Sequence, residues 1–145
     1  ADPKEVKPGM RAFMPGFPGG AVGEATARLI GQTLIERSKR GERNEVALAW
    51  AKAGQTLGLK GDLNQLLRGP AIDDASRVVG VTLKESPRRG RIYTSTPQTV
   101  LAIANPPERT PDYESEATVT KRNYGIVADT LRREYRVAQV GCIKS

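Results

Sequence analysis

The sequence predicts an α+β fold with an N-terminal extended arm, a three-helix unit, a β-hairpin, and a C-terminal helix or strand. Three observations support this class. Proline and glycine crowd residues 1–20, apolar residues recur at helical spacing between residues 22 and 69, and apolar and polar residues alternate from about residue 76. We expect a docking arm over residues 1–20 and one α+β domain over residues 21–145, helical at 21–70, a hairpin at 76–104 and mixed at 114–145.

Residues 1–20 are expected to form the extended arm. Their four prolines and four glycines are incompatible with a helix interior and interrupt a strand. The arm also carries three large apolar side chains, Phe13, Met14 and Phe17. Because exposed apolar side chains mark interaction sites, we expect these three to dock, either on the body of this chain or on a neighbouring subunit.

Three helices are expected to follow the arm. Residues 22–40 carry apolar residues and threonines at i, i+3, i+4 and i+7, which is the spacing of an amphipathic helix. Residues 44–57 repeat this spacing around Trp50, with Asn44 as the expected N-cap. Residues 62–69 form a short third helix that begins at a capping-box pattern and ends at a Gly-Pro pair.

The second half of the domain is expected to be mostly extended. Residues 76–104 read as a β-hairpin because both arms are rich in β-branched residues and a basic turn separates them. Pro97 places the second arm at an edge or a bulge. Residues 105–113 form a stiff connection. Residues 123–140 fit either a helix or a strand, and their apolar spacing favours the helix.

The glycine-rich stretch at residues 11–29 resembles a phosphate-binding loop in composition only. A P-loop requires lysine and a hydroxyl residue directly after its last glycine, because they contact the phosphates and Mg²⁺. Here Gly23 is followed by Glu24, whose negative charge repels a phosphate. We therefore interpret this stretch as a hinge before a helix.

The sequence offers little for catalysis or metal binding. It has no histidine and one cysteine, Cys142, which excludes Ser–His and Cys–His pairs and the usual zinc ligand sets. The acidic residues Asp112, Glu114 and Glu116 lack the lysine that a nuclease-like metal site would place after them, so we assign them to a solvated loop. We predict no catalytic residue, no metal site, no cofactor and no enzymatic activity.

The charge of the chain points to an anionic partner. Twenty-three basic residues face sixteen acidic ones, a formal net charge of +7. The chain has four basic clusters, and residues from three of them are predicted to bind the anion. Arginine predominates among these residues, which suits bidentate contacts with phosphate or carboxylate. The candidate anion-binding residues are Arg37, Lys39, Arg40, Arg43, Arg88, Arg89, Arg91, Arg132, Arg133 and Arg136.

Two functions remain open at this point. The first is a non-enzymatic structural subunit of a large assembly that contacts nucleic acid through its arginine clusters. The second is a linker or self-assembling, capsid-type subunit that binds acidic protein surfaces and other copies or subunits of the assembly, without nucleic acid. The single cysteine fits a reducing, cytoplasmic compartment, and no apolar run is long enough to span a bilayer.

Overall fold

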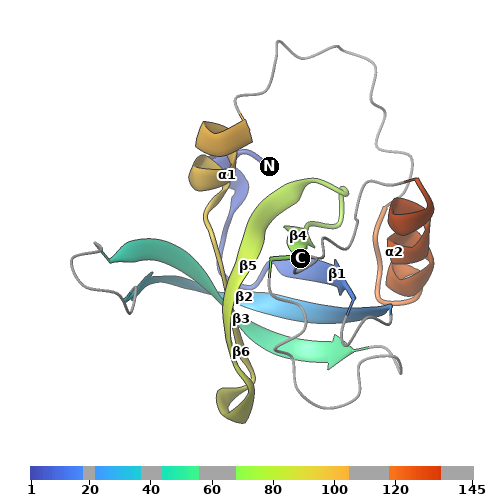
Figure 1. Cartoon of the computed structure of the whole chain (residues 1–145), viewed down its shortest axis with the longest axis horizontal. Coiled ribbons are helices and arrows are strands. Elements are labelled where there is room, and N and C mark those ends of the chain that lie inside the picture. The colour runs from blue at the N-terminus through green and yellow to red at the C-terminus, as the bar shows by residue number, and fades with distance from the viewer. Residues whose placement is uncertain (18–21, 37–43, 56–67, 105–117, 135–145) are drawn as a thin grey trace, which may run out of the picture.

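The computed structural model is built around a closed barrel of six antiparallel strands in the order β1-β2-β3-β6-β5-β4 (Figure 1). It describes residues 1–17, 22–36, 44–55, 68–104 and 118–134. The strands are β1 (Arg11–Gly16), β2 (Gly23–Ile35), β3 (Glu45–Gln55), β4 (Pro70–Ile72), β5 (Val78–Ser86) and β6 (Arg91–Thr94). There are also two short 3-10 helices among the described residues. η1 (Pro3–Glu5) precedes β1, and η4 (Pro87–Arg89) connects β5 to β6.

The register of the strands closes the barrel. β2 pairs with β1 on one side and with β3 on the other, and β3 pairs with β6 along its second edge. The circle is completed where Phe13 of β1 pairs with Ile72 of β4. Closure removes free sheet edges from the barrel itself, which is how small antiparallel proteins avoid unwanted strand pairing.

Large and small side chains alternate inside the barrel. Trp50 is the largest fully buried side chain, and Met14 and Leu48 pack in the same cluster. Leu29, Val79 and Ile92 belong to this cluster too, and four alanines in it, Ala12, Ala25, Ala27 and Ala71, are fully buried. The interior of a six-stranded barrel is narrow, so small residues opposite one large ring let the wall close around it.

Two α-helices lie outside the barrel: α1 (Pro97–Ala104), which follows β6, and α2 (Tyr124–Arg133) (Figure 1). α2 covers an apolar cluster on the outer face, in which Phe13, Ile72 and Val119 are buried and Tyr124 packs against them. The rings of Phe13 and Tyr124 lie 5.9 Å apart between centroids. β1 is therefore buried on both faces, by the barrel interior and by α2.

The predicted α+β fold with a three-helix unit is wrong. Residues 22–40 contain strand β2 and residues 44–57 contain strand β3, and these two pair with each other over most of their length. The predicted third helix at 62–69 lies largely outside the described residues. Alanine favours helices in isolation, but here it is selected for its size, since tertiary packing in the barrel outweighs intrinsic propensity.

The predicted N-terminal extended arm is also corrected in part, because residues 11–16 form strand β1 and stand in the barrel wall. The predicted hairpin exists between β5 and β6, which pair in antiparallel register around the η4 turn. Its second arm ends earlier than expected, at Thr94, and Pro97 begins helix α1. Proline at the first turn of a helix requires no backbone donor, so its position agrees with its chemistry.

Candidate functional site

A run of hydroxyl side chains follows the end of β6. Trp50 Nε1 donates to Thr94 Oγ1 at 2.9 Å, and Thr94 Oγ1 donates to the carbonyl oxygen of Ser95 at 3.0 Å. Ser95 Oγ accepts from the backbone nitrogen of Val81 at 2.9 Å. All of these groups are buried or half-buried, so the hydroxyls satisfy the backbone and the indole inside the wall. Their role in this part of the chain is structural.

Gly80 allows β5 to approach this run closely. A methyl group at residue 80 would lie 2.4 Å from the carbonyl oxygen of Ser95 and 2.7 Å from Thr94 Oγ1. No real side chain tolerates those separations, so glycine is required here by the close approach of two backbones.

The inner face of β5 carries two further buried polar side chains, Thr82 and Glu85. Thr82 pairs directly with Thr94 across the ladder, yet its Oγ1 has no hydrogen-bond partner among the described residues. Within that same part of the chain, none of the hydroxyls of Thr82, Thr94 and Ser95 is hydrogen-bonded to a carboxylate or an amine. A nucleophile needs such a neighbouring base to be activated.

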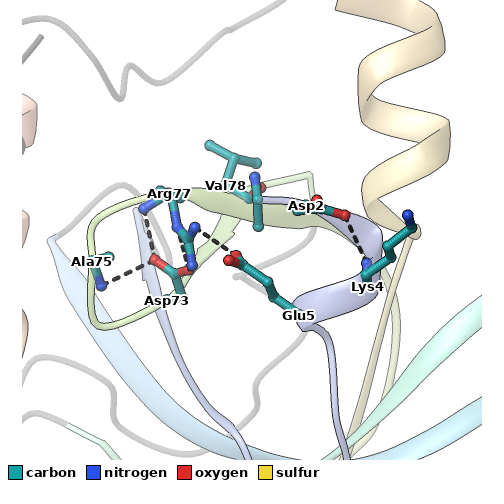
Figure 2. A network of polar contacts seen from close by, with 8 residues as sticks. Asp2, Lys4, Glu5, Asp73, Ala75, Arg77 and Val78 are labelled. Atoms are coloured by element: carbon teal, nitrogen blue, oxygen red, sulfur yellow. Dashed lines mark hydrogen bonds and ion pairs between the residues drawn. The ribbon is translucent and has the colours of Figure 1, made fainter.

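Asp73 organises the turn between β4 and β5 (Figure 2). Asp73 is 1% exposed, and its carboxylate accepts from the backbone nitrogens of Ala75 and Arg77, at 3.0 and 2.8 Å. The Arg77 guanidinium donates to it at 2.9 Å through Nε and also forms an ion pair with Glu5 of η1. The hydrogen bond with Asp73 raises the pKa of Arg77 above its usual value. This network attaches the N-terminal segment to the barrel, so the charged groups of Asp73 and Arg77 have a structural role.

Arg132 fastens α2 to the barrel wall. The Arg132 and Glu24 side chains form an ion pair, and each is only 7% exposed. Arg132 also donates to the carbonyl oxygens of Gly16 and Gly23, both at 3.0 Å, and its guanidinium lies 5.3 Å from the ring centre of Phe17. A buried charge needs this degree of compensation, because its desolvation is costly.

The ribbon formed by the ends of β2 and β3 has an open edge. The β1–β2 ladder ends at Arg28, after which only Leu29 bonds to the segment before β1, while β2 continues to Ile35 beside β3. In the described part of the chain, no strand pairs with the outer edge of residues 30–35. Ile30 and Leu34 are exposed there, and Leu34, at 63%, sits opposite exposed Val46. An open strand edge that carries apolar side chains is a template for another extended chain.

The predicted anion-binding residues are dispersed over the molecule. Arg88 and Arg89 are exposed in the η4 turn, Arg91 is half-buried at the start of β6, and Arg133 is exposed on α2. Arg132 is buried in the ion pair with Glu24 and is not available to an external anion. The remaining members fall outside the described residues: Arg37, Lys39, Arg40, Arg43 and Arg136.

The three predicted docking residues all pack within this chain. Met14 lies in the barrel core, Phe13 lies under α2, and Phe17 is half-buried beside the Arg132 guanidinium. The helix interpretation of residues 22–57 concealed the open edge of β2. The signal that could have revealed it is the β-branched Thr33 and Ile35 at the end of the pattern, which favour a strand.

Within the part of the chain that the structure describes, no group of three or more cysteine, aspartate and glutamate side chains is arranged to hold a metal ion. Among the helices that the structure describes, none has the length and apolar character to cross a bilayer.

No family model matches the chain, and no curated protein sequence matches it. Its structure is similar to the Rv3671c protease from M. tuberculosis in the active form, with 18% identity and a TM-score of 0.57, covering 79% of this chain and 50% of that one. It is also similar to an inactive form of the Rv3671c protease, with 19% identity and a TM-score of 0.55, covering 69% of this chain and 49% of that one. The chain thus spans about half the length of the protease structures it matches.

This likeness contradicts the prediction of a non-enzymatic nucleic-acid-binding or linker subunit, and with it the prediction that the chain has no enzymatic character. The linker prediction used a free N-terminal arm, and residues 11–16 of that arm form a strand of the barrel instead. At this level of sequence identity, the structural match establishes a shared fold. The six-stranded antiparallel barrel of this chain has the same fold as about half of the matched protease structures.

Proposed function

We propose that this barrel is part of a protease-like protein and supplies a wall on which an extended polypeptide binds. The observation that carries the proposal is the closed barrel, which is similar over most of its length to half of a protease structure. Half of such a structure leaves room for the remainder of a hydrolytic site to lie on another domain or chain.

The composition of the chain determines which catalytic groups it could supply and which would come from another domain or chain. Peptide hydrolysis by a serine-type mechanism uses a nucleophile, an imidazole that takes and returns its proton, and donors for the oxyanion. This sequence contains no histidine. The imidazole would therefore come from outside these residues, while the barrel positions the peptide.

The open edge of β2 is the site we assign to the peptide. Among the residues that the structure describes, no strand pairs with one side of residues 30–35, and Ile30 and Leu34 project exposed apolar side chains. An added strand would form main-chain hydrogen bonds along this edge and bury those two side chains, which gives affinity with little sequence requirement.

The test uses a fluorescein-labelled, uncharged peptide rich in valine and threonine, with binding followed by anisotropy. Replacing Ile30 and Leu34 with glutamine should weaken binding by about tenfold, or about 1.4 kcal/mol. The matched control replaces Ile103 and Ile126, which are 80% and 71% exposed on the two α-helices, and should bind as the parent does. Equal loss in both variants, or no binding by the folded parent, would overturn the proposal.

The same peptide tests whether the catalytic imidazole comes from outside these residues. The chain alone should leave it intact over the time of the binding experiment, because no imidazole is present. Cleavage by the chain alone, followed by mass spectrometry, would contradict an imidazole supplied from elsewhere and would leave the edge-binding result standing.

A further inference from the structure

The strand register places three arginines in one row across the outer wall of the barrel. Arg11 of β1 is directly opposite Arg28 of β2, Arg28 is opposite Ala51 of β3, and Ala51 is opposite Arg91 of β6. These four positions lie on four consecutive strands of the barrel. We call Arg11, Arg28 and Arg91 the arginine row.

The row faces outward. Ala12 and Ala27, which neighbour the first two arginines, belong to the interior cluster, as do Trp50 and Ile92. Because successive side chains of a strand point to opposite faces, the arginines point away from the interior. Arg28 is exposed, while Arg11 and Arg91 are half-buried. The residue between Arg28 and Arg91 in the row is Ala51, a small residue.

More positive charge surrounds the row. Tyr93 lies two residues beyond Arg91 on the same face and is paired with exposed Lys84. Arg88 and Arg89 are exposed in the adjoining η4 turn. In the described ranges, no carboxylate forms an ion pair with any of the three arginines or with Lys84. Arg28 donates to a carbonyl oxygen, that of Gly9, at 3.2 Å.

The arginine row differs from Arg77 and Arg132 in its lack of carboxylate partners among the described residues. Arg77 and Arg132, which hold the fold together, are each neutralised by two carboxylates. Arg11 and Arg28 are instead placed directly opposite each other, an arrangement of like charges that destabilises a sheet. Local conflicts of this kind are retained where a surface has a function.

We propose that the arginine row binds an acidic segment of a polypeptide. Adjacent strands lie about 4.8 Å apart, so three strand steps separate Arg11 from Arg91 by about 14 Å. An extended chain advances about 6.7 Å for every second residue, so alternate carboxylates along such a segment match this span. Arginine binds carboxylates in bidentate geometry.

A polypeptide fits this wall better than a nucleic acid does. Single-stranded nucleic acids bind where exposed aromatic side chains stack on successive bases. Tyr93, the aromatic residue beside the row, is half-buried, and Ala49 and Ala51 form the wall next to it. The surface is independent of the open β2 edge, because it recognises charge and the edge recognises backbone.

The test measures binding of a fluorescein-labelled oligoglutamate peptide by anisotropy over a salt series. Changing Arg11, Arg28 and Arg91 to glutamine should weaken binding at low salt by at least about tenfold and reduce its salt dependence. The control changes Lys121, Arg122 and Arg133 to glutamine, which removes the same charge from exposed positions near and on α2. This control should lose less than about twofold, since it changes only the net charge.

Two results obtained with the triple variants or with the two labelled ligands would overturn the proposal. One is an equal loss in both triple variants, which would reduce the effect to net charge. The other is tighter binding of a labelled single-stranded oligonucleotide than of oligoglutamate through the same three arginines. If the triple variant fails to fold by circular dichroism, Arg91→Gln alone replaces it, because no hydrogen bond of the Arg91 side chain occurs among the described residues; unchanged affinity in that variant would also refute the arginine row.

Discussion

The buried ion pair between Arg132 and Glu24 makes the attachment of α2 testable by stability measurements. Arg132→Met removes the cation, the ion pair and two hydrogen bonds to the carbonyl oxygens of Gly16 and Gly23, while it retains much of the aliphatic volume. Removing one partner of a buried pair costs about 3–5 kcal/mol, because the other charge stays desolvated. At about 3 °C per kcal/mol, Tm should fall by roughly 10–15 °C.

Urea unfolding followed by the fluorescence of Trp50 gives the free energy of the barrel, because this single tryptophan is fully buried in it. The double variant Glu24→Gln/Arg132→Met should recover part of the loss, since no uncompensated charge then stays buried. A matched substitution, Arg133→Met, changes the exposed neighbour on α2 and should stay within about 0.5 kcal/mol of the parent. A loss below about 1 kcal/mol for Arg132→Met would refute the reasoning.

Three further substitutions probe the barrel and its attachments. Gly80→Ala should destabilise the protein by about 1–3 kcal/mol in urea titrations, because the new methyl group meets the Ser95 carbonyl; a neutral effect would show that the two backbones are not in close contact. Asp73→Ala should cost at least about 2 kcal/mol by the same assay, since it leaves two backbone donors and the Arg77 guanidinium without their acceptor, and a change within experimental error would contradict that network. Burial, with a smaller contribution from the charge of Glu24, raises the pKa of the Tyr124 phenol. A group whose pKa is raised by folding contributes stability below its unfolded pKa of about 10 and loses it as pH rises through the folded pKa, so alkaline destabilisation should be smaller in Tyr124→Phe; identical pH profiles would contradict this.

The β5–β6 hairpin could be predicted from the sequence because its signals are local. β6 alternates between half-buried and buried residues, and Gly90 adopts a left-handed conformation at the turn, with φ of 57°. β2 carries no such clean signal. Residues 23–27 are buried on both faces, and a bulge between Leu29 and Gly31 shifts the phase of the strand. Apolar residues and threonines from the two faces of the strand together recur at i, i+3, i+4 and i+7, and this combined spacing imitates a helix.

The candidate surfaces could not be predicted, for a different reason. Arg11, Arg28 and Arg91 come together only through the pairing of four strands, and that register depends on the closed barrel. Clustering along the sequence identified Arg91 but neither Arg11 nor Arg28. It also selected Arg132, whose charge is paired with Glu24 inside the fold. Spacing along the chain does not distinguish a basic residue that binds a partner from one that supports the structure.

The most direct test of the barrel is a set of nuclear Overhauser contacts in the isotope-labelled chain. The barrel predicts cross-strand contacts between Phe13 and Ile72, where it closes, and between Leu48 and Thr94, together with the strong sequential contacts of an extended chain over residues 23–35. Successive amide–amide contacts along residues 23–35, with none between Phe13 and Ile72, would indicate a helix there and contradict the closed barrel.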